Sequence, residues 1–297
     1  MRPAYPVSLL ALVCAVASAS PASADTLETP APGARNLAAA GGWQTWAAPT
    51  GAGRWRLLLR APDGTVSVPS IDDFGAAPDP AIGSDRRAFA GRRLLVVYAR
   101  CAGDSALRGC DVFTLQLNGA AGEQRVDRLA SRTYSETAPA LALGRFSFVR
   151  RGGGARRGVH TWSAGSSEAP RRLSAVLARE TATNGGRVAY AYRSSRGGGL
   201  VVRRPAVPRG VVQPASRQEV VPSSITLDRY RATWLLGSRA LQTARLAGSG
   251  GPYPLRILTA DRALPPGTIS ILANGNRAVR ALTPRGVTRL VPPARFR

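Results

Sequence analysis

Short runs of apolar and aromatic residues recur along the chain, and each run is bounded by Gly, Pro, Asn or Asp. Helical periodicity is weak throughout, whereas β-branched and aromatic runs between turn residues are typical of strands. The pattern therefore predicts an all-β fold with little room for helices. The clearest strand-like runs are residues 55–59, 94–98, 145–149, 187–191 and 230–234.

Aromatic landmarks divide the chain into units of similar length. Trp46, Tyr98, Phe148, Tyr190 and Trp234 are separated by 52, 50, 42 and 44 residues. This spacing fits four short antiparallel strands per unit, since a propeller blade has about 40 to 45 residues. We therefore predict a β-propeller of about six four-stranded blades, the last running from about Ile257 to the C-terminus with a strand over 268–272. A β-sandwich ranks second because it gives no reason for the spacing.

One copy of the repeat carries a family resemblance. The segment 135–150, SETAPALALGRFSFVR, resembles the repeat of TolB-like, WD-repeat-like β-propellers. In that repeat a proline precedes the innermost strand, and a turn with glycine leads into a strand rich in aromatic residues. Weaker copies cover 184–190 and 223–234, although the family's usual Ser-Pro-Asp-Gly turn is absent. The resemblance implies a scaffold that binds partners across its faces, with enzymes as a minority use.

Residues 1–24 have the features of a cleavable secretory signal. Arg2 precedes an apolar run of 13 residues from Val7 to Ala19, and Ala22-Ser23-Ala24 supplies a small-residue cleavage site. The run is shorter than the roughly 20 residues that cross a bilayer. We expect cleavage after Ala24, a single propeller domain over 25–297 without a transmembrane segment, and a secreted or cell-envelope location.

Export would place the two remaining cysteines in an oxidising compartment. Cys101 and Cys110 lie between the apolar runs 94–98 and 112–115, which suggests a hairpin with a disulfide at the base of its loop. A redox pair or a metal site is the alternative. The spacing is not Cys-x-x-Cys and no histidine is near, so the structural disulfide is the better interpretation.

Composition excludes several kinds of chemistry. All 41 basic residues are arginine, so mechanisms that need a lysine ammonium, such as a P-loop or a Schiff base, are excluded. No Gly-x-Ser-x-Gly elbow occurs, and one histidine cannot form a multi-histidine zinc site. We interpret His160 as a packed or solvated side chain, with a general base as the alternative. We predict no cofactor and no metal ion.

Acidic residues are better candidates for a functional site than His160. Asp72, Asp73, Asp79 and Asp85 lie in one Pro- and Gly-containing connection and could hold calcium or take part in catalysis. Their spacing does not match an EF-hand, however, and Asp is common in turns. We expect Glu136 in a loop before an innermost strand, open to the central channel. The alternative for Glu136 is a hydrogen-bonding role that holds this loop.

The formal net charge of +24 is concentrated in the second half of the chain. Residues 1–136 contain 14 Arg and 12 acidic residues, whereas residues 137–297 contain 27 Arg and 5 acidic residues. If these blades are contiguous, one side of the ring is electropositive and would concentrate polyanions. A codon preference for Arg over Lys is the alternative, but it does not explain the scarcity of acidic residues. The candidate ligand-binding residues are Glu136, Arg150, Arg151, Arg156, Arg157, Arg171 and Arg172.

We therefore predict an exported TolB-like propeller that acts as a non-enzymatic binding or scaffold module. Its partner would be an anionic envelope component or an envelope protein. Nucleic acid is not expected, because charge alone gives only salt-sensitive, non-specific binding. One alternative is a hydrolase or lyase acting on an anionic polymer, with Glu136 and the carboxylates of 72–85 near its channel. Another is a structural subunit of an envelope complex.

Overall fold

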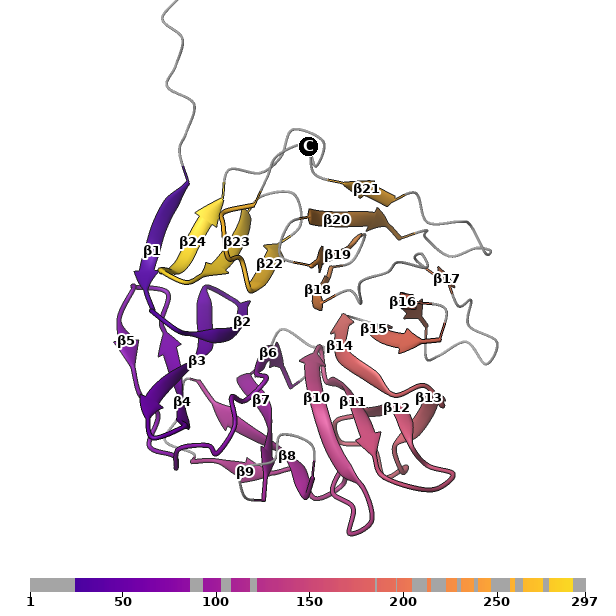
Figure 1. The fold of residues 1–297 in the computed structure, drawn as a ribbon. Helices are drawn as coiled ribbons and strands as arrows, with labels where there is room; N and C mark the ends of the chain where they lie inside the picture. Colours follow the sequence, from indigo (N-terminus) through magenta and orange to yellow (C-terminus); the bar gives the residue numbers. More distant parts are fainter. Residues whose placement is uncertain are drawn as a thin grey trace, which may run out of the picture.

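In the computed structural model, the described part of the chain contains 24 β-strands, which form six four-stranded antiparallel sheets. The six sheets surround a central axis (Figure 1), which confirms the predicted six-bladed propeller. No helix that could cross a membrane occurs in the part of the chain that the structure describes. The described residues are 25–85, 93–102, 108–117, 122–184, 186–195, 197–204, 213–214, 223–228, 231–237, 240–246, 257–259, 264–274 and 278–290. The expected signal segment 1–24 lies outside them.

Each blade places its first strand next to the axis and its second strand behind it. The innermost strands are β2 (Arg35–Ala40), β6 (Ala81–Ser84), β10 (Ser135–Ala142), β14 (Ala178–Asn184), β18 (Ser223–Leu227) and β22 (Ser270–Asn274). The second strands are β3 (Trp43–Gly51), β7 (Leu94–Cys101), β11 (Arg145–Arg151), β15 (Arg187–Ser194), β19 (Arg231–Leu236) and β23 (Ala278–Thr283). The five strand-like runs expected from the sequence lie in second or third strands, although Tyr230 is outside the described residues.

The outer half of each blade is formed by a third strand and a short edge strand. The third strands are β4 (Arg54–Arg60), β8 (Cys110–Gln116), β12 (Gly158–Ser163), β16 (Gly197–Arg203), β20 (Ala240–Arg245) and β24 (Gly286–Leu290). The outermost strands are β5 (Val66–Ser67), β9 (Gln124–Arg125), β13 (Arg171–Ser174), β17 (Gln213–Pro214), β21 (Ile257–Thr259) and β1 (Thr26–Pro30). Short edges of this kind limit strand addition by other chains.

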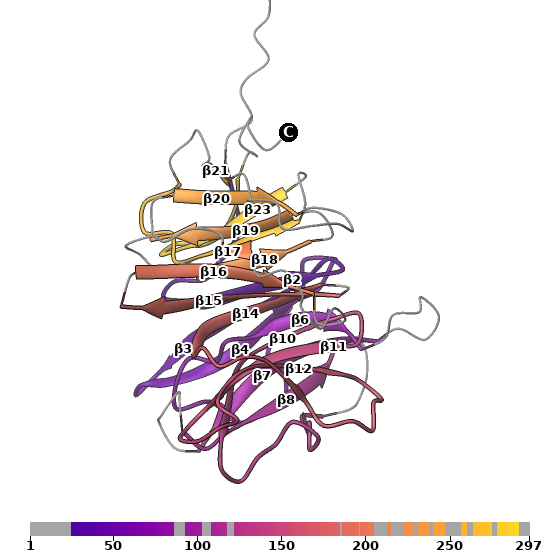
Figure 2. The same ribbon diagram turned by 90° about the vertical axis from the view of Figure 1, so that its right-hand side faces the viewer.

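The hydrophobic core is divided among the six spaces between neighbouring blades. Each aromatic landmark is buried and faces the blade that precedes its own. Trp46 shares a cluster with Leu282 of the sixth blade, and Trp234 shares one with Leu200 of the fourth. Figure 2 shows the fourth and fifth blades stacked in this way. The sixth blade has Val279 and Ala281 at its interface with the fifth, and no aromatic residue of β23, so the aromatic period ends there.

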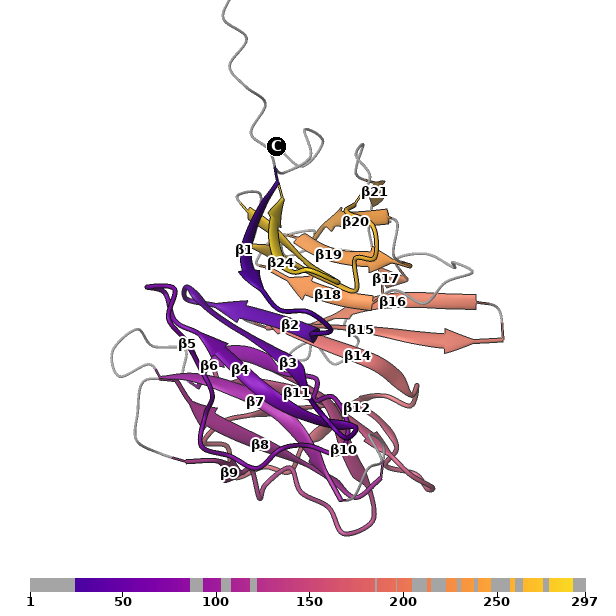
Figure 3. The same ribbon diagram turned by 60° about the vertical axis from the view of Figure 1, so that its left-hand side comes forward.

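The N-terminal strand closes the ring. β1 pairs antiparallel with β24, so the sixth blade combines one strand from the start of the chain with three from its end (Figure 3). The predicted boundary at Ile257 is therefore wrong: β21 is the edge of the fifth blade, and the sixth begins with β22. The strand expected over 268–272 begins at Ser270. Pairing across the ring, which local sequence does not encode, sets this boundary.

Close packing at the axis depends on a glycine. Gly83 of β6 lies against the backbone of β10, and a β-carbon at this position would overlap the carbonyl oxygen of Leu141. Only glycine permits so close a backbone approach. This contact brings the innermost strands of the second and third blades together beside the channel.

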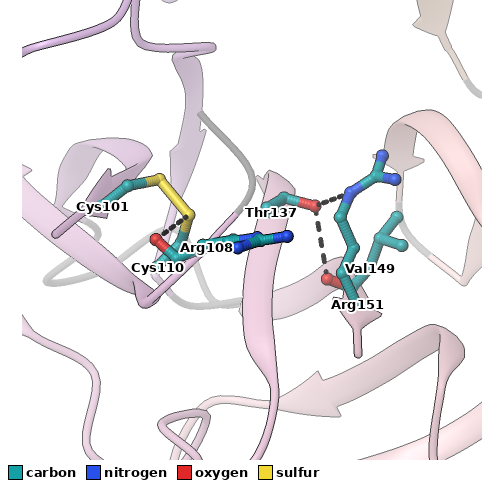
Figure 4. The surroundings of a disulfide bond; sticks show 6 residues. All are labelled: Cys101, Arg108, Cys110, Thr137, Val149 and Arg151. Atoms are coloured by element: carbon teal, nitrogen blue, oxygen red, sulfur yellow. Dashed lines mark hydrogen bonds between the residues drawn. A yellow bond between two sulfur atoms is a disulfide. The ribbon is translucent and has the colours of Figure 1, made fainter. Parts of the chain in front are cut away.

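The predicted hairpin and its disulfide are confirmed. Cys101 ends β7, Cys110 begins β8, and the two residues pair directly across the hairpin. A disulfide joins them, and Cys110 is buried. Figure 4 shows this bond on one side of Thr137, with Arg151 on the other.

Candidate functional site

The innermost strands line a channel along the axis, and a local irregularity shapes its wall. Asn36, Ala138, Glu180 and Ser224 each lie ten residues before an aromatic landmark, near the start of an innermost strand. The ladders of β2, β10, β14 and β18 each change register at this point. Asn36, Ala138 and Ser224 have positive φ angles between 48° and 57°. Bulges of this kind redirect side chains, and here they surround the channel.

Hydrogen bonds at or next to the irregular positions tie neighbouring blades together. Asn36 Nδ2 donates to the carbonyl oxygen of Pro78 at 2.7 Å, and Thr181 Oγ1 donates to that of Ala138 at 2.8 Å. Ser224 Oγ lies 2.8 Å from Ser270 Oγ, and the two hydroxyls hydrogen bond. These contacts fix the geometry of the channel wall.

The charges of two carboxyl groups, those of Asp79 and Glu180, interact inside the channel. Asp79 precedes β6 and Glu180 lies in β14, and both line an inner cavity of about 310 Å³. Both oxygens of Glu180 accept backbone N–H groups, Oε2 from Ser224 at 2.6 Å and Oε1 from Ile225 at 2.5 Å. Burial raises the pKa of Glu180, and the charge of Asp79 raises it further. Desolvation by the channel wall also raises the pKa of Asp79, although its side chain keeps contact with solvent. The channel therefore resists carrying two negative charges at once.

Two arginines lie at the mouth of this channel. Arg151 and Arg179 line an outer cavity of about 620 Å³, which also includes Asp79. Arg151 is held by Thr137 Oγ1, which accepts from Nε at 2.9 Å, and by the Ala178 carbonyl, which accepts from Nη2 at 2.9 Å. Burial lowers the pKa of Arg151, and the positive charge of Arg179 lowers it further. Neither guanidinium has an ion pair with an acidic residue in the described part of the chain, so the two groups can form a site for an anion.

The other arginines at the mouth have protein partners. Arg100 Nε donates to Glu123 Oε1 at 2.7 Å, and the guanidinium lies over the Phe74 ring at 4.3 Å. Arg54 Nη2 donates to the Asp73 carbonyl oxygen at 2.7 Å. These contacts position the two side chains along the rim, so Arg151 and Arg179 are the better candidates for ligand contact.

Glu136 does not lie in a loop open to the channel, contrary to expectation. It belongs to β10, its side chain is fully buried, and its Oε1 accepts from Arg150 Nε at 3.1 Å. Arg150 is 7% exposed and also donates to the Leu129 carbonyl oxygen at 3.1 Å. Burial raises the pKa of Glu136 to about 7, against the opposing charge of Arg150. The buried pair has the contacts of the structural alternative and holds β10 against β11.

The remaining predicted arginines lie away from the channel. Arg156 and Arg157 are exposed in the turn between β11 and β12, and Arg171 and Arg172 are exposed in the edge strand β13. Arg172 Nη1 donates to the Ala155 carbonyl oxygen, which ties the edge strand to that turn. The structure thus separates the six predicted arginines into one at the channel mouth, one buried, and four on the rim of the third blade.

The aspartates of 72–85 do not form one cluster. Asp73 pairs with Arg56, whose Nε is 3.0 Å from Oδ1, and Asp85 pairs with Arg93, whose Nε is 2.8 Å from Oδ2. Asp79 alone reaches the inner cavity. In the described ranges, no group of three His, Cys, Asp or Glu side chains comes together as metal ligands would. The calcium site considered from the sequence is not formed there.

His160 has a packing role. It is buried in β12, its ring stacks on Phe148 with centroids 5.6 Å apart, and its Nε2 lies 2.7 Å from the Arg156 carbonyl oxygen. Burial lowers its pKa to about 4, so the imidazole is neutral at physiological pH. This matches the packed side chain favoured by the sequence.

Sequence reasoning missed Glu180 and Arg179 as site residues. The signal was present in the period itself, because Glu180 stands ten residues before Tyr190, as Ser224 stands before Trp234. Positions related by the repeat lie side by side around the channel. Aligning the blades on the position ten residues before each landmark would have identified residues of the channel wall, which the density of arginine did not.

The fold and the site define a closed six-bladed β-propeller with a polar axial channel. No known family pattern matches the sequence, and no curated protein matches it. Similar solved structures include a protein described as a putative oxidoreductase (glucose dehydrogenase) from Thermus thermophilus, with a TM-score of 0.55, 16% identity, and coverage of 90% of this chain and 99% of that one. A luciferin-regenerating enzyme matches with a TM-score of 0.52, 10% identity, and coverage of 89% and 94%.

TolB from Acinetobacter baumannii is also among the similar structures. Its TM-score is 0.49 at 13% identity, and the match covers 72% of this chain and 52% of that one. The chain thus spans about half the length of TolB. At such identities the likeness concerns the fold, and the chemistry must be argued from this chain's own residues.

Proposed function

We propose that this chain is an exported, non-enzymatic binding module that takes an anionic group at the mouth of its channel. The observation that carries the proposal is the placement of Arg151 and Arg179 on one cavity, where neither forms an ion pair with a described acidic residue. The ligand would belong to an envelope component or to an envelope protein. The disulfide between Cys101 and Cys110 supports a location outside the cytoplasm, where such bonds persist.

The geometry favours this function over general attraction by the basic half of the chain. Arg151 is fixed by two hydrogen bonds that leave its Nη1 for a ligand, since no described residue accepts from that atom. Arg179 is exposed at the rim of the same cavity. A positioned guanidinium loses less freedom on binding than a solvated one, so it gives more affinity and more specificity.

The proposal is tested by retention on immobilised poly-L-glutamate at increasing salt. The double variant R151Q/R179Q should bind about ten-fold more weakly than the wild type, because each guanidinium supplies charge-assisted hydrogen bonds. The matched control R156Q/R157Q removes the same charge from the exposed rim turn and should change affinity much less. Equal losses in the two variants would replace this site with diffuse electrostatic attraction.

A hydrolase or lyase is the second candidate. Glu136 gives it no support, but Asp79 and Glu180 are carboxyl groups with raised pKa inside a cavity, as acid catalysts are. This function predicts product release from polygalacturonate that is lost in D79N. If the wild type releases no product, the hydrolase or lyase function is refuted.

A further inference from the structure

The outer and inner cavities share Asp79 and Arg179, and we treat them as one site. Arg151 lines only the outer cavity and Glu180 only the inner one. Arginine outnumbers acidic residues around the outer cavity, whereas the two carboxyl groups of Asp79 and Glu180 outnumber Arg179 around the inner one. This polarity is a property of the cavities, independent of the net charge of the chain.

The opposite charges at the junction remain unpaired with each other. Asp79 and Arg179 share two cavities, yet no ion pair or hydrogen bond joins their side chains within the described part of the chain. Asp79 has no hydrogen-bond partner there, and its side chain is exposed to solvent where the two cavities meet. Its carboxylate is therefore accessible to a cationic group of a ligand, which would gain a charge-assisted hydrogen bond from it.

The carboxyl end is suited to an ammonium group. Both Glu180 oxygens already accept backbone N–H groups, so the carboxyl is held in one orientation. Those two N–H groups each occupy a lone pair of the carboxyl group, so too few oxygen ligands remain for the six to eight that Ca²⁺ takes. An ammonium group has three donors and one charge, so it can bridge Asp79 and Glu180 without a full set of oxygen ligands.

We infer that this site binds a compact zwitterion, with its anionic group on Arg151 and Arg179 and its primary ammonium group between Asp79 and Glu180. The inference rests on the proposed anion site and adds the second half of the ligand. The combined cavities are of the size that holds a small molecule. The other charged side chains around the two cavities are Arg54, Asp72, Asp73 and Arg100.

Binding should depend on pH in one direction. A cation favours ionised carboxyl groups, and a larger fraction of Asp79 and Glu180 is ionised as pH rises. The preference for a ligand with an amine should therefore increase between about pH 5 and about pH 8. The guanidinium groups stay charged over this range, so an anion without an amine should show no such increase.

The test is calorimetric titration of protein that retains residues 25–297 with two matched pairs of probes. β-Alanine is compared with propionate, and phosphoethanolamine with ethyl phosphate, so the pairs also distinguish a carboxylate from a phosphate. The amine-bearing member of at least one pair should bind about ten-fold more tightly at pH 8, as expected for charged hydrogen bonds. D79N should abolish this preference and leave the affinity for the amine-free anion intact.

Controls separate the two proposals. D72N removes an equal charge from the mouth and should keep the preference for the amine, whereas R179Q should weaken both members of a pair. If amine-free anions bind in an Arg179-dependent way and the amine adds nothing, the zwitterion is refuted and the anion site stands. If neither member binds, both proposals fall. Far-ultraviolet circular dichroism of each variant confirms that the propeller is folded.

Discussion

Glu28 and Arg280, which are 252 residues apart in the sequence, form a two-pronged ion pair at the seam of the ring. Arg280 Nε donates to Glu28 Oε2 at 2.6 Å, and Nη2 donates to Oε1 at 3.1 Å. Gln44 Nε2 of the first blade donates to the same carboxylate at 3.3 Å. The three side chains therefore join the N-terminal strand, the last blade and the first blade.

Breaking this pair should destabilise the closed ring. E28Q leaves the partly buried Arg280 without its counter-charge, so we expect a loss of about 1–3 kcal/mol in the free energy of unfolding, measured in urea. R125Q breaks the exposed pair between Arg125 and Asp127 and should have little effect. A double-mutant cycle of E28Q and R280Q without coupling would show that the seam depends on strand pairing alone.

The same pair should make stability depend on pH. Burial alone would raise the pKa of Glu28, but its hydrogen bonds with Arg280 and the charge of that residue hold the pKa below its usual range. The stabilisation is therefore present above the unfolded pKa of about 4.3 and is lost as pH falls through the lower folded value. Urea unfolding at several pH values should show this loss in the wild type and not in E28Q.

The aromatic landmarks should be the most sensitive positions of the core. Trp46 and Phe148 are fully buried between blades, so W46A or F148A should reduce stability by about 3–5 kcal/mol through lost burial and a residual cavity. V66A, at an exposed edge position, serves as the control and should leave stability nearly unchanged. Equal effects would mean that the blade interfaces repack freely around the missing ring.

The disulfide should stabilise the protein because it restricts the conformations of the unfolded chain. Cys101 and Cys110 are 9 residues apart, and a loop of this length corresponds to about 2–3 kcal/mol in the chain-entropy model. C101S/C110S should show this loss, and reduction of the wild type with dithiothreitol should reproduce it. Mass spectrometry of the unreduced protein should recover the two cysteines in one cross-linked peptide. Two free thiols would contradict the bond.

Asp79 should lower stability as pH rises, the opposite of Glu28. The surrounding channel wall raises its folded pKa to about 6, and because the side chain is exposed the resulting effect on stability should be small. The unfavourable contribution is absent below about pH 4 and grows up to the folded pKa, because the unfolded chain ionises more readily. D79N should therefore gain stability relative to the wild type between pH 4 and neutrality. D72N removes an equal charge at the exposed rim and is the matched control.

Local patterns were sufficient for much of this fold. The spacing of Trp46, Tyr98, Phe148, Tyr190 and Trp234 predicted the blades because one large side chain fills each of five blade interfaces. The hairpin of Cys101 and Cys110 was also predictable, since strand, turn and strand are adjacent in the chain. The sixth blade was misplaced because β23 has Ala281 where the other second strands have an aromatic residue, so the last interface gives no aromatic signal.

The number of arginines in a segment did not predict which of them line the channel mouth. Arg150 and Arg151 are neighbours in the sequence, yet alternation along β11 turns one toward Glu136 and the other toward Thr137. A run of arginine does not reveal which side chain meets an acidic group from another strand. Only the pairing of β10 with β11 shows that Arg150 is buried and Arg151 lines the mouth.

The sequence by itself determined the all-β class, the period, the aromatic interfaces and the disulfide, because each depends on residues close together in the chain. Tertiary structure decided the closure by β1, the pairing of Glu28 with Arg280, and the meeting of Asp79 with Glu180 in the channel. These contacts join different blades, and their geometry depends on how six sheets share one axis. The chain's excess of arginine could therefore be counted in advance, but the two arginines at the channel mouth could not be chosen from it.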